Sequence, residues 1–164
     1  MKQFLLFNWM AILAVLPAWG ADSVAARLDR LEAHQAIETL MIRYGQALDA
    51  HDWDKFAGLF GEDGIWTSRF GSVHGTKAMK DFLEANVPKR PFGSYHLFSN
   101  FEIRTEGDKG TVWAHWAIVS GTGTPGLVNS GHYEVTVVRK KGEWTFAHLT
   151  VFNDLPNIAI PASK

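Results

Sequence analysis

The pattern that decides the fold begins at Ser94, with the stretch SYHLFSNFEIR over residues 94–104. Apolar and aromatic residues alternate there with other residues on a period of two, which predicts a β-strand. Three later segments, rich in Val, Thr, Trp, Phe and Tyr, show the same alternation: Gly110–Gly121, Leu127–Arg139 and Glu143–Asp154. Turn-forming residues separate the segments, at Glu106–Asp108, Gly121–Gly126 and Lys140–Gly142. The second half of the chain is therefore predicted to be an antiparallel meander.

The residues before Pro88 follow the period of a helix instead. From Ser23 to Asp49 we assign the recurring apolar residues to one face of a long amphipathic helix: Leu28, Leu31, Ile37, Leu40, Met41, Tyr44 and Leu48. Asp52 is expected to cap a short second helix, Trp53–Phe60, and an extended piece follows at Ile65–Thr67. Thr76 is expected to cap a third helix, with inward residues Ala78, Met79, Phe82 and Leu83. This order indicates the α+β class, with helices packed on one face of a curved, mainly antiparallel sheet.

Length and composition are those of one globular domain, since the chain has 164 residues of which 46% are hydrophobic. The 16 basic and 17 acidic side chains nearly balance, so we expect no nucleic-acid partner. The absence of cysteine excludes disulfides, thiolate metal sites and a cysteine nucleophile. The seven histidines show no tight metal-ligand spacing, so we expect no metal and no cofactor.

The N-terminus has the pattern of a secretory signal. Lys2 precedes an apolar run from Phe4 to Trp19, which contains Pro17 and leads to Gly20 as the small residue of a cleavage site. We expect removal of residues 1–20 and a periplasmic or secreted protein without membrane association; an uncleaved membrane anchor is the alternative. The domain would then span residues 21–155, followed by a loose tail at 156–164.

The last predicted strand is apolar on both faces, with Trp144, Phe146 and Phe152 on one side and Ala147, Leu149 and Val151 on the other. Helices can cover only one face of a single sheet. A second copy of the chain is the simplest cover for the other, so we expect a homodimer through the outer sheet face.

Asp49 stands at the C-terminal end of the long predicted helix, where the helix dipole disfavours a carboxylate by about 0.3–1 kcal/mol. Capping of the next helix is the simple explanation, but Asp52 is better placed for that role. Tyr44, five residues earlier, is either a core tyrosine or a second residue of the same cavity. Asp49 is therefore a candidate functional residue.

His96 lies near the start of the first long strand, between apolar neighbours, and we expect it to be buried. A buried imidazole needs a hydrogen-bond partner on at least one nitrogen. Without a carboxylate nearby it would be an ordinary core histidine. An inward carboxylate from the long helix would fix the tautomer and leave the other nitrogen as a base that works near neutral pH.

Six short motifs, in this order and spacing, carry a resemblance that extends from about Leu31 to Asp154: Ala36–Leu40, Tyr44, Leu48–Asp54, Val73–Thr76, His96–Asn100 and Gly142–His148. The chain resembles the SnoaL-like branch of the nuclear transport factor 2-like superfamily, which implies a cone-shaped α+β fold. In this superfamily, scytalone dehydratase and hexachlorocyclohexane dehydrochlorinase pair an aspartate with a histidine at positions matching Asp49 and His96. Ketosteroid isomerase has a tyrosine matching Tyr44.

The departures from these relatives matter as well. The aspartate base of the isomerase falls at Ser68, and its protonated aspartate falls near Gly131. The second histidine of the dehydratase falls at Gly121, and its tyrosine beside the aspartate is Leu48. The arginine that helps the dehydrochlorinase to receive chloride is Leu149. What remains is an Asp–His dyad with Tyr44 as a possible hydrogen-bond donor.

The resemblance implies a cofactor-independent lyase that removes water, or a small carbon fragment such as formaldehyde. The expected substrate is a hydroxylated aromatic, polyketide-like or steroid-like molecule. His96 would act as base, Asp49 would stabilise the imidazolium, and Tyr44 would donate to the developing oxyanion. The expected substrate-binding residues are Trp53, Phe56, Phe60, Trp66, Phe82 and Leu149.

Two alternatives stay open at this point, a non-catalytic periplasmic binding module for small molecules and a ketosteroid-isomerase-like isomerase. The sequence assigns no role to four further polar residues: Arg43, His115, His132 and His148.

Overall fold

The computed structural model describes residues 22–87, 93–121 and 126–155. Its helices and strands, in chain order, are α1 (Val24–Ala50), α2 (Trp53–Gly58), β1 (Phe60–Ser68), β2 (Gly71–His74), α3 (Thr76–Asn86), β3 (Ser94–Glu106), β4 (Lys109–Ser120), β5 (Gly126–Lys140) and β6 (Glu143–Asn153). The expected signal segment, the C-terminal tail and residues 122–125 of the expected turn lie outside the described residues. Within the described ranges, no helix is both long and apolar enough to cross a membrane.

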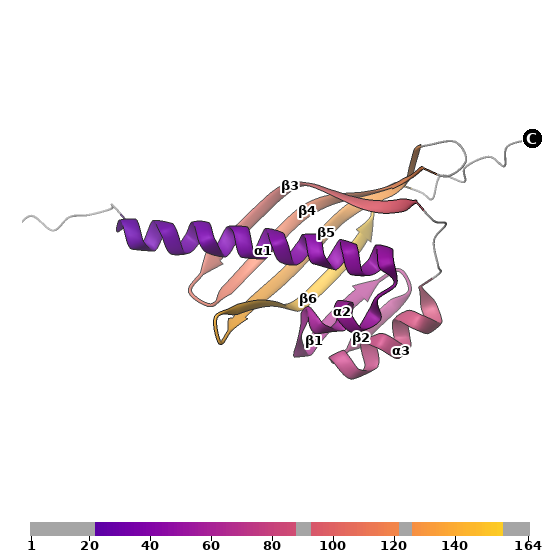
Figure 1. The fold of residues 1–164 in the computed structure, drawn as a ribbon, viewed down its shortest axis with the longest axis horizontal. Helices are drawn as coiled ribbons and strands as arrows, with labels where there is room; N and C mark the ends of the chain where they lie inside the picture. Colours follow the sequence, from indigo (N-terminus) through magenta and orange to yellow (C-terminus); the bar gives the residue numbers. More distant parts are fainter. Residues whose placement is uncertain (1–21, 88–92, 122–125, 156–164) are drawn as a thin grey trace, which may run out of the picture.

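One mixed sheet carries the fold, with the strand order β2-β1-β6-β5-β4-β3. Neighbouring strands are antiparallel except β1 and β6, which run parallel. Figure 1 shows α1 lying across the sheet, with α2 and α3 beside β1 and β2. The expected α+β class, with helices packed on a mainly antiparallel sheet, is thus confirmed.

The short helix ends earlier than expected. Phe60, expected at the end of that helix, is instead the first residue of β1, because it pairs with Phe146 of β6. The expected extended piece at residues 65–67 is the later half of this nine-residue strand. At the start of α3, the capping position belongs to Gly75 rather than Thr76, because the backbone there has φ 82°, in the left-handed region that favours glycine.

The apolar face assigned to the long helix is only partly right. Ile37, Met41 and Tyr44 are fully buried against the sheet, but Leu28 and Leu31 are exposed. Leu31 and Ile37 are six residues apart, which turns an α-helix by about 240° and places them on different faces. Leu28 and Leu31 therefore belong to a second, outward stripe of α1.

The alternation expected along the last strand is interrupted by a bulge. Val137 pairs with Phe146 and Thr136 pairs with His148, so Ala147 is an extra residue in β6. Phe146 and Leu149 are both buried as a result, while Phe152 points outward. The outer face still exposes Tyr95, Leu97, Leu127 and Phe152, and the homodimer through it stays a prediction.

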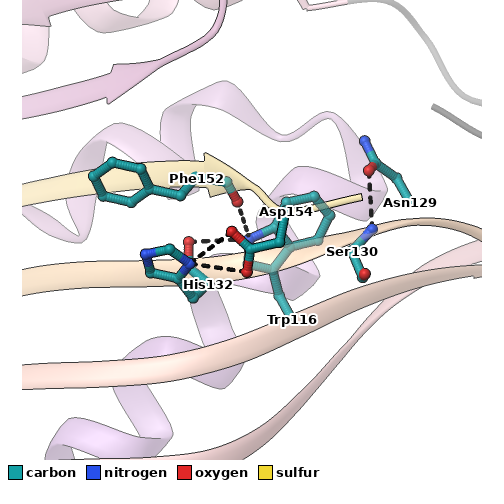
Figure 2. Close-up of polar contacts among 6 residues, drawn as sticks. All are labelled: Trp116, Asn129, Ser130, His132, Phe152 and Asp154. Carbon is teal, nitrogen blue, oxygen red and sulfur yellow. Dashed lines mark hydrogen bonds and ion pairs between the residues drawn. The ribbon is translucent and has the colours of Figure 1, made fainter. Parts of the chain in front are cut away.

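Gly131 of β5 lies where two strands and a large side chain meet. The Trp116 indole N–H donates to the carbonyl oxygens of His132 and Phe152, at 3.2 and 3.1 Å (Figure 2). A Cβ atom on Gly131 would collide with the Phe152 carbonyl and press on the Trp116 ring. The close packing of β5, β6 and Trp116 thus requires glycine at this position.

We predict that Gly131→Ala lowers the free energy of unfolding by about 2–3 kcal/mol, because backbone of β6 must move to admit the methyl group. Urea unfolding followed by tryptophan fluorescence measures this. Gly126→Ala on the same strand is the control, since nothing lies within 4 Å of its added Cβ. Equal stability of the two variants would contradict the packing described.

Candidate active site

The C-terminal end of α1 places Asp49 at the sheet. The helix ends at Ala50, and His51 takes a left-handed conformation with φ 53°. The His51 N–H donates to the carbonyls of Ala47 and Leu48 and so closes the helix. Asp49 therefore lies in the last turn, where the helix dipole opposes its charge.

The carboxylate of Asp49 is held by two hydrogen bonds from one residue of β3. The backbone N–H of His96 donates to Oδ2 at 2.9 Å, and His96 Nδ1 lies 2.7 Å from Oδ1. The His96 side chain is 3% exposed and the Asp49 side chain 20%. These two bonds offset the unfavourable position at the helix end, so the expected pairing of Asp49 with His96 is present.

Gly45 makes this pairing possible. It lies one turn before Asp49 on the same face of α1, and a Cβ there would collide with the ring of Phe98 and lie 3.5 Å from His96 Cβ. Because the helix has no side chain at this point, β3 approaches it closely. A short aspartate side chain can then reach both the backbone and the ring of His96.

The pairing also fixes the chemistry of the imidazole. An ionised carboxylate only accepts hydrogen bonds, so Nδ1 carries the proton of this bond. The ring lies between Phe98 and Trp116, with ring centroids 6.1 and 6.3 Å away. The Asp49 carboxylate and these two rings thus hold the imidazole of His96 in one orientation.

Tyr44 is fully buried on the same helix. Its hydroxyl accepts a hydrogen bond of 3.0 Å from the Trp66 indole N–H. The indole donor thus fixes the position of the Tyr44 hydroxyl oxygen. The ring of Tyr133 meets it edge-on, at 5.5 Å between centroids.

A cavity of about 270 Å³ lies between the end of α1 and the sheet. Three residues expected at the site line it, Tyr44, His96 and Trp66. Asp49 is not among its lining residues, so His96 stands between the carboxylate and the cavity. Asp49 is therefore placed to orient and charge-stabilise His96 rather than to touch a ligand.

Several lining residues escaped the sequence interpretation. They include Arg69, Phe70, Trp116, Ser120, Asn129, Tyr133 and Asn153. The inward positions of β4 and β5 could have indicated Trp116, Ser120 and Tyr133, since they follow the alternation of each strand. Asn129 is buried, and its Oδ1 accepts from the Ser130 N–H at 2.9 Å (Figure 2).

The other five residues expected to bind substrate do not line the cavity. Phe56 packs on Phe60 and Trp66 in the hydrophobic core, and Trp53 and Leu149 are buried in that core as well. Phe82 is half-buried beside Trp66. Their aromatic character reflects packing between α2, α3 and β1, which a sequence pattern does not separate from ligand binding.

The remaining histidines lie outside the cavity. His132 Nδ1 lies 2.9 Å from both carboxylate oxygens of Asp154, in a second His–Asp pair on the outer face (Figure 2). His115 contacts Asn100, and His148 contacts Thr67. Arg43 borders a separate surface hollow. In the part of the chain that the structure describes, no three His, Asp or Glu residues cluster as metal ligands.

We predict that Asp49→Ala lowers the free energy of unfolding by about 2–4 kcal/mol, because two part-buried donors of His96 lose their acceptor. Denaturant unfolding of purified protein measures the loss. Asp54→Ala is the control, because its exposed carboxylate pairs only with Lys80 and should contribute less than about 1 kcal/mol. Similar losses for both variants would show that the Asp49 pairing is not tight.

Comparison with known proteins agrees with this architecture. The family model of the SnoaL-like domain matches residues 29–150. Curated proteins gave no match.

Solved structures with the same fold include three named proteins. Hexachlorocyclohexane dehydrochlorinase LinA-type3 from Novosphingobium barchaimii is 21% identical, with a TM-score of 0.68 over 81% of this chain and 94% of that one. A protein assigned as a scytalone dehydratase, from Novosphingobium aromaticivorans, is 24% identical, with a TM-score of 0.68 over 84% of this chain and 95% of that one. ActVI-ORFA from Streptomyces coelicolor is 17% identical, with a TM-score of 0.65 over 75% of this chain and 98% of that one. The family model covers most of the chain and leads to one conclusion: this chain belongs to the SnoaL-like domain family.

Proposed function

We propose that this protein is a cofactor-independent lyase that eliminates water from a small hydroxylated carbonyl compound bound in the cavity. The observation that carries the proposal is the Asp49–His96 pair, with Nδ1 2.7 Å from the carboxylate and the ring lining the cavity. A neutral imidazole oriented in this way is a suitable base for a carbon acid. Loss of a small carbon fragment such as formaldehyde would use the same groups.

The proposed reaction needs one proton to move twice. His96 Nε2 removes the proton from the carbon next to the carbonyl, and the electron pair moves onto the carbonyl oxygen as an enolate. Tyr44 donates a hydrogen bond to that oxygen, while Asp49 stabilises the imidazolium. The enolate then expels the hydroxyl on the neighbouring carbon, which takes the proton from His96 and leaves as water. The base is restored to its starting state.

The cavity supports a compact substrate. Its volume of about 270 Å³ exceeds the roughly 150 Å³ that holds benzene and lies near the lower limit for ligand pockets, about 300 Å³. Aromatic walls from Trp66, Trp116 and Tyr133 favour a flat molecule. We therefore favour a substrate of one or two rings over a steroid.

Isomerase chemistry of the ketosteroid type receives less support. Ser68, at the position of the isomerase base, cannot act as a carboxylate base. Gly131, near the position of its protonated aspartate, admits no side chain without moving β6. Elimination of chloride receives less support as well, because Leu149 is fully buried where the dehydrochlorinase has an arginine.

We predict that His96→Gln lowers turnover by about 10²–10⁴-fold, because the base is removed. The assay uses a panel of β-hydroxyketones with one or two rings in deuterated water. Mass spectrometry follows loss of one water and deuterium uptake into the remaining substrate. His132→Gln is the matched control, since it disrupts a similar His–Asp pair outside the cavity, and it should keep full turnover.

The outcome also separates the lyase from a binding module. A ligand that binds the cavity with neither deuterium uptake nor product would favour the binding module. Full turnover in His96→Gln would end the proposed mechanism.

Tyr44→Phe is expected to lower kcat by about 10²-fold while changing KM much less, because the donor acts on charge that develops during the reaction. Stability should also fall by about 1–3 kcal/mol, since the Trp66 N–H loses its acceptor. Tyr95→Phe, on the exposed outer face, is the control for both measurements. An unchanged kcat in Tyr44→Phe would remove this residue from the mechanism.

A further inference from the structure

The first turns of α1 expose an apolar stripe that none of the described helices and strands covers. Val24, Leu28 and Leu31 are 79%, 52% and 66% exposed. Figure 1 shows this end of the helix extending past the strands of the sheet. Large apolar side chains exposed side by side on a helix usually mark an interaction surface.

The stripe has the spacing of a coiled-coil seam. Counting from Val24, the steps to Leu28, Leu31 and Gln35 are four, three and four residues. These are the d, a, d and a positions of a heptad repeat. A helix that covers a sheet with one broad face does not need a second seam with this spacing.

The seam faces away from the body of the protein. Ile37, Met41 and Tyr44 form the buried face of α1, on the opposite side of the helix axis. Asp29 fixes the projecting part, since its carboxylate accepts from Arg139 at 3.0 Å and Arg139 also donates to Asp108 at 2.8 Å. The hydrogen bond to Asp29, and to a smaller extent the one to Asp108, raises the pKa of the Arg139 guanidinium above its usual value. The helix is thus held as an arm with a free apolar side.

We propose that α1 pairs with α1 of a second copy of this chain, parallel and in register, through Val24, Leu28, Leu31 and Gln35. The charged residues beside the seam indicate that the partner is a second copy of this chain. Arg27 occupies the g position and Glu32 the following e position, which is the spacing of the ion pair between helices of a parallel coiled coil. The pairing would form twice, once on each side of the seam.

Both residues are available for this contact. Among the described residues, Arg27 and Glu32 are exposed and no ion pair joins either to another side chain. Their charged neighbours Arg30 and Asp29 are already paired, with Asp22 and Arg139. Arg27 and Glu32 are five residues apart, too far around one helix to contact each other, so any coupling between them has to cross between chains.

Polarity limits the length and direction of the seam. The next d position is Glu38, which would face its own copy, so the close contact ends at Gln35. An antiparallel pair would place Arg27 opposite His34 and Glu32 opposite Ala25, and the opposite charges would not meet. Charge therefore favours the parallel arrangement.

Single cysteines test the geometry, because the chain has no cysteine of its own. The full-length chain is expressed, and the protein purified from the cells is oxidised with copper phenanthroline. Leu28→Cys and Gln35→Cys should each form a disulfide-linked dimer, since in-register a positions lie about 6 Å apart between Cα atoms. Ala26→Cys, on the outside of the seam, should stay unlinked. Equal linking at residues 26 and 28, or none at 28 and 35, overturns the proposal.

Charge reversal tests the partner without relying on any activity. Arg27→Glu and Glu32→Arg should each weaken the dimer by about five- to tenfold in sedimentation equilibrium, because like charges then face each other. The double variant should restore the original association. A dimer that resists both single changes but dissociates in Leu97→Glu would assign the contact to the outer sheet face instead and overturn the helix pairing. A monomer at every concentration would do the same.

Discussion

The close approach of α1 to β3 at Gly45 is the constraint on which the site depends. Without a side chain there, the helix lies against Phe98 and brings its last turn to the backbone of His96. Two hydrogen-bond donors of His96 then offset the unfavourable position of Asp49 at the end of the helix. The same contact that joins helix to sheet therefore sets the tautomer of the proposed base.

Much of this arrangement follows from sequence pattern, because periodicity reports which face of a segment is buried. The four long strands and the extent of α1 were predictable on that ground, and the position of Asp49 at a helix end marked it as unusual. The resemblance to a known family then joined Asp49 to His96. The assignment of Leu28 and Leu31 to the buried face was wrong, because the six residues from Leu31 to Ile37 turn the helix to a different face. A helix that carries an exposed apolar stripe as well as a buried face shows two overlapping apolar patterns in its sequence.

The cavity was less predictable, since bulges decide which side chains enter it. Val128 is an extra residue between the pairs Ile118–Asn129 and Val119–Leu127, so Val128 and Asn129 both reach the cavity wall. Ala147 similarly shifts the inward set of β6 from Phe146 to Leu149. Each bulge reverses the alternation beyond it. A single parity rule along β6 therefore misplaces residues such as Phe152, although the same rule finds Trp116 on β4 and Tyr133 on β5.

The protein contains two His–Asp pairs of similar geometry, and their surroundings distinguish them. His96 Nδ1 lies 2.7 Å from Asp49, and His132 Nδ1 lies 2.9 Å from Asp154. The His132 and Asp154 side chains are 21% and 45% exposed, and water competes there for every hydrogen bond. At His96 the apolar surroundings strengthen the interaction between imidazole and carboxylate, since a low dielectric screens charge poorly. The two pairs thus differ in burial rather than in geometry, and the pair on the outer face links the residue after β6 to β5.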